Sequence, residues 1–192
     1  MKAINKYKKF KPYNTVFAIF LITVIVSSVL GFIWYGKSEG FSELCRLITA
    51  EAENRYTAVF IELLFLLSVF IAGPTIYAPV GSFLTLFIYG ALAGARASLS
   101  IGDTYTAIVE VFFSSLTAYL LVIYSSFVTL TGIGIFTSQE DDGERRMFDG
   151  VMFRAKKFRG IFNFRYIASY ILFFLLFLAG NSTAVLLKTV LL

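Results

Sequence analysis

Charged residues divide the chain into long apolar stretches. A helix that crosses a membrane needs about 20 consecutive, mainly apolar residues. Four stretches without a charged side chain reach that length, and they lie between Lys11 and Lys37, Glu62 and Arg96, Glu110 and Glu140, and Arg165 and Lys188. Because each can hold at least one spanning helix, the pattern predicts a polytopic membrane protein.

Residues 14–35 are expected to form the first span. Five lysines precede them: Lys2, Lys6, Lys8, Lys9 and Lys11. A signal peptide also starts with basic residues, but its apolar region is only about 7–15 residues long and ends at small residues. This stretch is longer and ends at the bulky Trp34 and Tyr35. We therefore interpret it as an uncleaved anchor whose two last aromatic rings lie at the outer headgroup level.

The second apolar stretch contains Gly73, Pro74 and Pro79. Proline lacks a backbone donor and clashes with the preceding helical turn, so two prolines this close predict a helix break. Two short spans at about 57–73 and 79–97, joined as a tight hairpin, are one interpretation. A single kinked helix and a re-entrant loop are the alternatives.

The distribution of basic residues favours the hairpin. Lysine and arginine in short loops mark the cytoplasmic side. Besides the N-terminal lysines, basic residues gather in the segment 137–165, namely Arg145, Arg146, Arg154, Lys156, Lys157, Arg159 and Arg165. If both segments are cytoplasmic, an even number of spans separates them, which the hairpin supplies.

The resulting prediction is an all-α transmembrane bundle in a single domain, 1–192. Helices are expected because a lone strand would leave backbone groups unpaired in lipid. The bundle has five spans, with the N-terminus inside and the C-terminus outside. The spans are about 14–35, 57–73, 79–97, 104–126 and 166–187.

Two segments outside the spans carry amphipathic patterns. In the outer segment 38–55, apolar residues including Phe41, Leu44 and Cys45 recur at helical spacing. This indicates a helix resting on the membrane or the bundle, or an ordinary connecting helix. The inner segment mixes aromatic residues with Arg154, Lys156, Lys157, Arg159 and Arg165. We expect it at the anionic inner interface; a motor subunit or nucleic acid is the less favoured partner.

Composition excludes several kinds of chemistry. Apolar residues make up 58% of the chain and charged residues 15%, whereas soluble domains average about 45–50% and about 25%. The chain has no histidine and one cysteine, which removes histidine-based catalysis, an intrachain disulfide and thiolate clusters. The acidic run 139–144 lacks the ligand spacing of a calcium loop. We therefore expect no enzyme activity, metal or cofactor.

Three charged residues and two glycines are the candidate site residues. Glu62 and Glu110 lie inside apolar segments, where carboxylates are costly. Arg96 ends the intervening helix at the same depth, so the three are expected to form one buried cluster, either as a structural clamp or as a transport or proton site. Gly90 and Gly94 have the spacing that lets helix backbones approach closely, and we expect them to face another helix.

The order of these elements resembles the stage II sporulation protein M family of bacterial membrane proteins. The resemblance is carried by Phe70-Ile71-Ala72-Gly73, Pro79, the run from Phe87 to Gly94, and Phe164-Arg165-Tyr166-Ile167 before the last span. It implies a five-span cell-membrane protein without catalytic activity. Sporulation members anchor peptidoglycan-degrading partners during engulfment, whereas relatives with other roles include sequences that accompany transporter genes.

Sequence alone thus favours a noncatalytic membrane scaffold that recruits partner proteins. A membrane subunit of a transporter is the alternative, and its ATPase would be a separate polypeptide because this chain has no Walker motif. A homo-oligomer is also compatible with the pattern, and no nucleic-acid partner is expected. A membrane enzyme using Glu62 and Glu110 is the weakest of the interpretations, since nothing supplies a nucleophile or a metal.

Overall fold

The computed structural model describes residues 2–51, 55–73, 77–100, 104–137 and 164–191. Within these residues the chain is helical and contains no strand, which confirms the predicted all-α fold. The helices are α1 (Lys2–Tyr35), α2 (Glu39–Glu51), α3 (Arg55–Ala72), α4 (Ala78–Leu99), α5 (Thr104–Thr137) and α7 (Phe164–Leu191).

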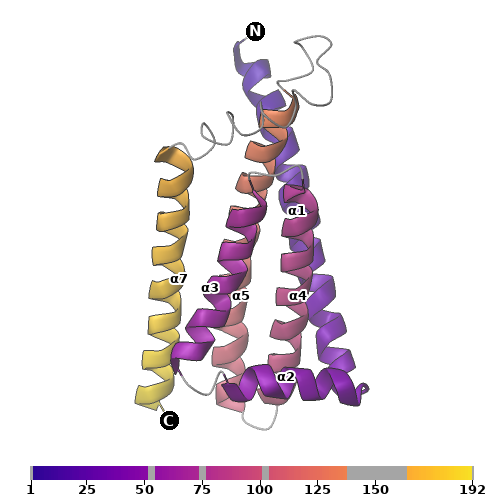
Figure 1. Ribbon diagram of the computed structural model, residues 1–192, viewed down its shortest axis with the longest axis vertical. Coiled ribbons are helices and arrows are strands. Elements are labelled where there is room, and N and C mark those ends of the chain that lie inside the picture. Colours follow the sequence, from indigo (N-terminus) through magenta and orange to yellow (C-terminus); the bar gives the residue numbers. More distant parts are fainter. Residues whose placement is uncertain (1, 52–54, 74–76, 101–103, 138–163, 192) are drawn as a thin grey trace, which may run out of the picture.

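All of these helices except α2 run along the long axis of the molecule, each antiparallel to the one before it (Figure 1). The start of α1, the end of α5 and the start of α7 therefore lie at one end of the bundle. The other end holds the C-terminus and α2, which lies across the bundle almost at right angles to the other helices. We call this the α2 end.

The apolar stretch with two prolines forms two helices. α3 ends at Ala72, and the Gly73 N–H donates to the Val69 carbonyl at 3.0 Å. α4 begins at Ala78, with Pro79 in its first turn. Backbone N–H groups of the first turn have no partner within the helix, so proline, which lacks an N–H, loses no hydrogen bond there. The chain therefore reverses here, and α3 and α4 form an antiparallel pair. Pro74 lies outside the described residues.

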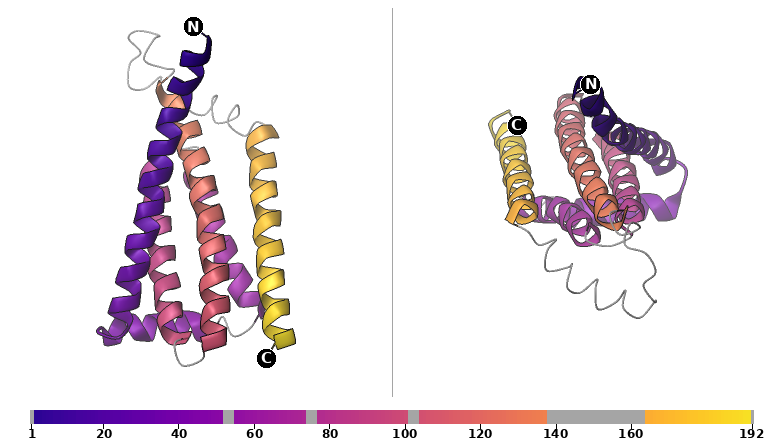
Figure 2. Two further views of the ribbon diagram at one scale, coloured as in Figure 1. Left: turned by 180° about the vertical axis from the view of Figure 1, so that it is seen from behind. Right: turned by 90° about the horizontal axis from the view of Figure 1, so that it is seen from above.

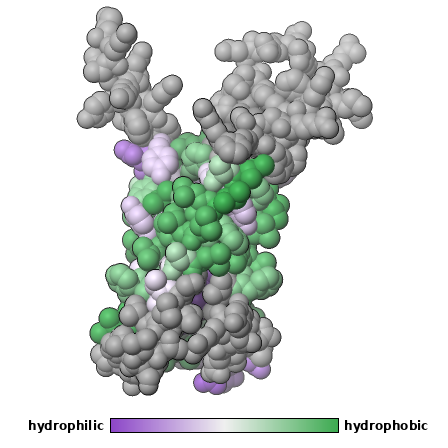
Figure 3. Space-filling model, turned by 90° about the vertical axis from the view of Figure 1, so that its left-hand side faces the viewer, coloured by the Kyte–Doolittle hydropathy of each residue, from purple (hydrophilic) through white to green (hydrophobic). Residues whose placement is uncertain are grey.

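Three helices are long and apolar enough to cross a membrane. They are Tyr13–Tyr35 of α1, Ala78–Leu99 of α4 and Ala107–Leu130 of α5, counted over the described residues. The apolar parts of α3 and α7 are shorter, Phe60–Ala72 and Ile167–Gly180. Figure 3 shows one face of the bundle, whose middle is mostly hydrophobic between hydrophilic atoms near its two ends. These features indicate a membrane protein.

α4 lies at the centre of the packing. It contacts α1, α3 and α5, and its pairing with α1 is the most extensive in the molecule. α7 lies at the opposite edge from α1 (Figure 2) and contacts α3 and α5. Aromatic rings make this contact, with ring centroids 4.4 Å apart for Phe70 and Tyr170 and 4.9 Å for Tyr124 and Phe173.

Several helices extend beyond the predicted spans. The basic segment before the first predicted span belongs to α1, which begins at Lys2. Lysine is a good helix former, so these residues continue the helix. α5 continues to Thr137, past the predicted end at residue 126 and through Gly132 and Gly134. A helical glycine costs only about 1 kcal/mol relative to alanine, which is too little to end a long helix. The predicted outer segment 38–55 contains α2, whose first turn is capped by the Ser38 side chain, with its Oγ 3.4 Å from the Phe41 N–H nitrogen.

Candidate functional site

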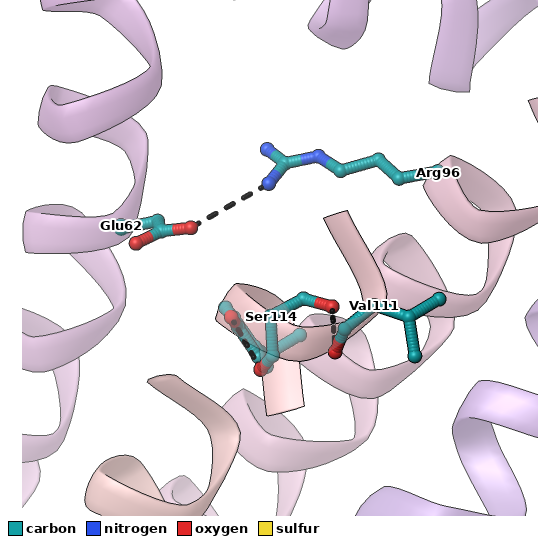
Figure 4. A network of polar contacts seen from close by, with 5 residues as sticks. Glu62, Arg96, Val111 and Ser114 are labelled. Carbon is teal, nitrogen blue, oxygen red and sulfur yellow. Dashed lines mark hydrogen bonds and ion pairs between the residues drawn. The ribbon is translucent and has the colours of Figure 1, made fainter. Parts of the chain in front are cut away.

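Glu62 and Arg96 form an ion pair near the α2 end of the bundle (Figure 4). Glu62 lies on α3, two turns after its start, and Arg96 lies in the last turn of α4. Because the two helices are antiparallel, these positions come to the same level. The Arg96 Nη1 and Glu62 Oε1 atoms are 3.6 Å apart, and the side chains are 12% and 9% exposed.

The pair is an electrostatic contact rather than a bidentate hydrogen bond. Charge-assisted N–H···O bonds are about 2.7–2.9 Å long, shorter than the 3.6 Å observed between Glu62 and Arg96. A lone charged side chain at the centre of a membrane helix costs about 2.5–3.5 kcal/mol on insertion scales. Placing Arg96 beside Glu62 offsets part of that cost for both residues.

Glu110, the third member of the predicted cluster, belongs to α5. The position of its side chain lies outside what the structure describes, so its contact with the pair stays a prediction. The neighbouring turn of α5 is described (Figure 4): the Ser114 hydroxyl donates to the Val111 carbonyl at 3.3 Å, and the Tyr89 hydroxyl of α4 donates to the Ser114 carbonyl at 3.3 Å. The Tyr89 bond joins α4 to α5 near the segment that contains Glu110.

The outer helix α2 lies against the same end of the bundle. Cys45 is 1% exposed and faces the bundle, whereas Leu44, expected on the same apolar face, is 52% exposed. Burial raises the pKa of the Cys45 thiol, and the positive charge of Arg96 partly opposes that rise. Arg96 therefore influences α2 as well as α3.

The glycines of α4 lie against the backbone of α1. A Cβ atom added at Gly94 would overlap the Ser28 carbonyl oxygen and lie 2.9 Å from the Phe32 nitrogen. One added at Gly90 would overlap the Ser27 hydroxyl and lie 2.8 Å from the Val24 carbonyl oxygen. Missing side chains of this kind let two helices come into backbone contact.

Sequence reasoning missed the matching glycine on α1. A Cβ atom at Gly31 would overlap the Ala91 carbonyl oxygen and lie 2.7 Å from the Ala91 carbonyl carbon. Gly31 follows Ser27 by four residues, which is the spacing of small residues that marks helix contacts in membranes. That spacing was present in the sequence, but small residues four apart also occur on α3 and α5, so only the structure shows that α1 is the partner of α4.

Hydroxyl groups join α4 to its other neighbours. The Ser68 and Thr85 hydroxyl oxygens, on α3 and α4, lie 3.0 Å apart within hydrogen-bond distance. The Thr129 hydroxyl of α5 donates to the Ser82 hydroxyl of α4 at 3.3 Å. Such bonds between membrane helices contribute about 0.6 kcal/mol on average, so they fix the relative positions of the helices more than they stabilise the bundle.

No family model, curated protein or solved structure matches this chain. Its function is therefore argued from its own residues. The predicted basic interface can be placed only in part: Arg165 falls in the first turn of α7, at the same end of the bundle as the start of α1 (Figure 1). Arg154, Lys156, Lys157 and Arg159 lie outside the described residues.

A groove with a volume of about 490 Å³ lies between α1, α4 and α5. Its walls are mostly apolar, and neither Glu62 nor Arg96 is among its lining residues. The buried ion pair and the groove are therefore separate features. The ion pair joins α3 to α4, whereas the groove presents a hydrocarbon-like surface.

Proposed function

We propose that this chain is a noncatalytic multi-pass protein of the cell membrane that positions partner proteins. The observation that carries this proposal is the use of the polar side chains inside the bundle. Glu62 contacts Arg96, Ser68 lies within hydrogen-bond distance of Thr85, and Thr129 bonds to Ser82. Each contact joins two helices, and none of these residues lines the groove.

The scaffold has five spans in this proposal, with α3 and α7 crossing the membrane beside α1, α4 and α5. The antiparallel order of the helices supports it, because the lysine-rich start of α1 and the Arg165 end of α7 lie at the same end of the bundle (Figure 1). Basic residues favour the cytoplasmic side, so this end is inside and α2 is outside.

The partners are proteins. The resemblance to the stage II sporulation protein M family suggests peptidoglycan-remodelling proteins, which would meet the chain at its α2 end. A second copy of the chain is another partner that the exposed apolar helices allow. The alternative function, a transporter subunit, requires an ATP-driven partner on the cytoplasmic side.

Isolation of the chain from its native membrane tests the scaffold. The chain carries an affinity tag, its neighbours are cross-linked before extraction in mild detergent, and the captured proteins are quantified by mass spectrometry. An unrelated multi-pass protein with the same tag and abundance is the control. We expect proteins with extracytoplasmic domains in near-stoichiometric amounts. A stoichiometric ATPase would support a transporter instead, and capture identical to that of the control would refute the scaffold.

Cysteine labelling tests the orientation. In a Cys45→Ala background, one variant carries Gly40→Cys on α2, where a side chain meets open space, and the matched variant carries Gly143→Cys. A membrane-impermeant maleimide should label the first in intact cells and the second only after permeabilisation. The reverse pattern would invert the orientation. A third variant with a cysteine at the N-terminus is needed if both positions are labelled in intact cells. If that N-terminal cysteine stays unlabelled, the number of spans between the N-terminus and residue 143 cannot be even.

A further inference from the structure

The groove between α1, α4 and α5 lies close to the contact between α1 and α5. In the left-hand view of Figure 2, α1 and α5 lie close together at the end that holds the N-terminus and diverge toward the α2 end, with α4 behind them. The Phe17 and Tyr119 rings meet edge to face, with centroids 6.0 Å apart, and join α1 to α5 where they converge. On α1 the groove begins at Leu21, one turn beyond Phe17, and on α5 it includes Tyr119.

The surface of the groove is mostly apolar. Small residues form much of its α4 and α5 walls: Ala93, Gly94, Ala97, Ser114, Ser115 and Ala118. The contact of Gly94 with the Ser28 carbonyl holds α4 deep against α1. The Ser114 hydroxyl donates to a carbonyl of its own helix, so it offers little to a polar ligand.

The length of the groove matches half a bilayer. It extends from Phe32 to Leu21 on α1 and from Val111 to Val122 on α5, about 16 Å in each case at the helical rise. The hydrocarbon core of a bilayer is about 30 Å thick, so one leaflet contributes about half of that. The walls belong to the three helices that are long and apolar enough to span a membrane. The groove lies mainly in their halves nearest α2 and extends about one turn past the midpoints of the α1 and α5 spans.

We propose that this groove binds one acyl chain of a lipid in the leaflet on the α2 side. The proposal rests on the membrane placement given above and is independent of the scaffold role. The groove has a volume of about 490 Å³, which is the size of a small-molecule site. Small-molecule sites of about 300–1,000 Å³ are common.

Photo-cross-linking tests the proposal on the full chain. The chain is reconstituted into vesicles of phosphatidylethanolamine and phosphatidylglycerol with a trace of phosphatidylcholine that carries a diazirine midway along one acyl chain. Flotation first shows whether the chain enters the vesicles. Adducts are then mapped by mass spectrometry, and we expect them to concentrate on Ser28, Ala93 and Ala118, which line the groove and are not exposed, rather than on the exposed Ile88 and Leu172 outside it.

Groove-filling variants provide the decisive comparison. Ser115→Phe and Ala97→Phe each place a ring in the groove, whereas Ile108→Phe places the same ring on an exposed part of α5 outside it. We expect groove adducts to fall about tenfold in the first two, equivalent to about 1.4 kcal/mol, and to stay unchanged in the third. Circular dichroism verifies folding, and competition by unlabelled lipid in the unmodified chain gives a second measurement that needs no variant.

If flotation shows that the chain has entered the vesicles, three outcomes would overturn the proposal. Adducts spread evenly over all exposed residues would mean annular lipid only. Groove adducts that persist in both filled variants would place the acyl chain elsewhere. Cross-links that join two copies of the chain through Ser115 or Val29 would show that protein occupies the groove. Failure of the chain to float would instead refute the membrane placement.

Discussion

Replacing Gly94 with alanine should loosen the contact between α1 and α4. The new methyl group would overlap the Ser28 carbonyl oxygen and lie 2.7 Å from the Ser28 carbonyl carbon. These are backbone atoms of a helix, so no side-chain rotation can relieve the contact. The two helices must move apart, which also weakens the contacts that Gly31 and Gly90 allow.

The expected loss of stability follows from two opposing effects. Overpacking a well-packed site costs about 1–3 kcal/mol, and a backbone clash belongs at the upper end. Alanine in place of a helical glycine returns about 1 kcal/mol or less. The net loss at Gly94 is therefore about 2 kcal/mol, which lowers the ratio of folded to unfolded chains about 30-fold.

Gly180→Ala is the matched control. Gly180 is also inside a helix, but a Cβ atom there meets nothing within 4 Å, so alanine should stabilise the protein by about 0.5–1 kcal/mol. Reversible unfolding of both variants in mixed detergent micelles measures the difference. If Gly94→Ala is as stable as Gly180→Ala, backbone contact between α1 and α4 is not what places glycine at position 94.

Removing the arginine of the buried ion pair should destabilise the fold, because Arg96→Ala leaves the Glu62 carboxylate buried without its cation, a change that costs about 3 kcal/mol. Adding Glu62→Gln and Glu110→Gln should restore most of the unfolding free energy; no recovery would show that Arg96 acts through packing alone. The Cys45 thiol should react with a maleimide more slowly than a thiol at Gly40→Cys, because burial raises its pKa and less thiolate is present near neutral pH. Equal labelling rates of the two thiols at all pH values would contradict the burial of Cys45. The stability that the buried neutral thiol contributes is complete below the ordinary thiol pKa and is lost as pH rises through the raised pKa.

Local rules in the sequence predicted the helices and the chain reversal. Pro74 and Pro79 predicted the break because proline restricts the backbone wherever it occurs. The antiparallel pair that results then brings Glu62 and Arg96 to one level by simple counting. The helix break depends on residues close in sequence, whereas the preference for two spans over one kinked helix depended on the basic residues of two distant segments.

Contacts between distant helices could not be derived in the same way. Gly90 and Gly94 indicated a close helix contact, but several helices could have supplied the partner, and only the position of Gly31 distinguishes α1. The groove depends on the angle between α1 and α5, which is set by packing such as the contact of Phe17 with Tyr119. No residue pattern along a single helix encodes that angle.

The pairing of α1 with α4 also has a consequence for the time course of synthesis. Gly31 and the Ala91 residue it contacts are about 60 positions apart in the chain. At about 5–20 residues per second, the ribosome needs about 3–12 s to cover that distance. For this interval α1 is made but its partner is not, so its small-residue face stays uncovered while α2 and α3 emerge. α4 is therefore the helix whose arrival allows α1 and α3 to assemble, and α5 and α7 are added after it.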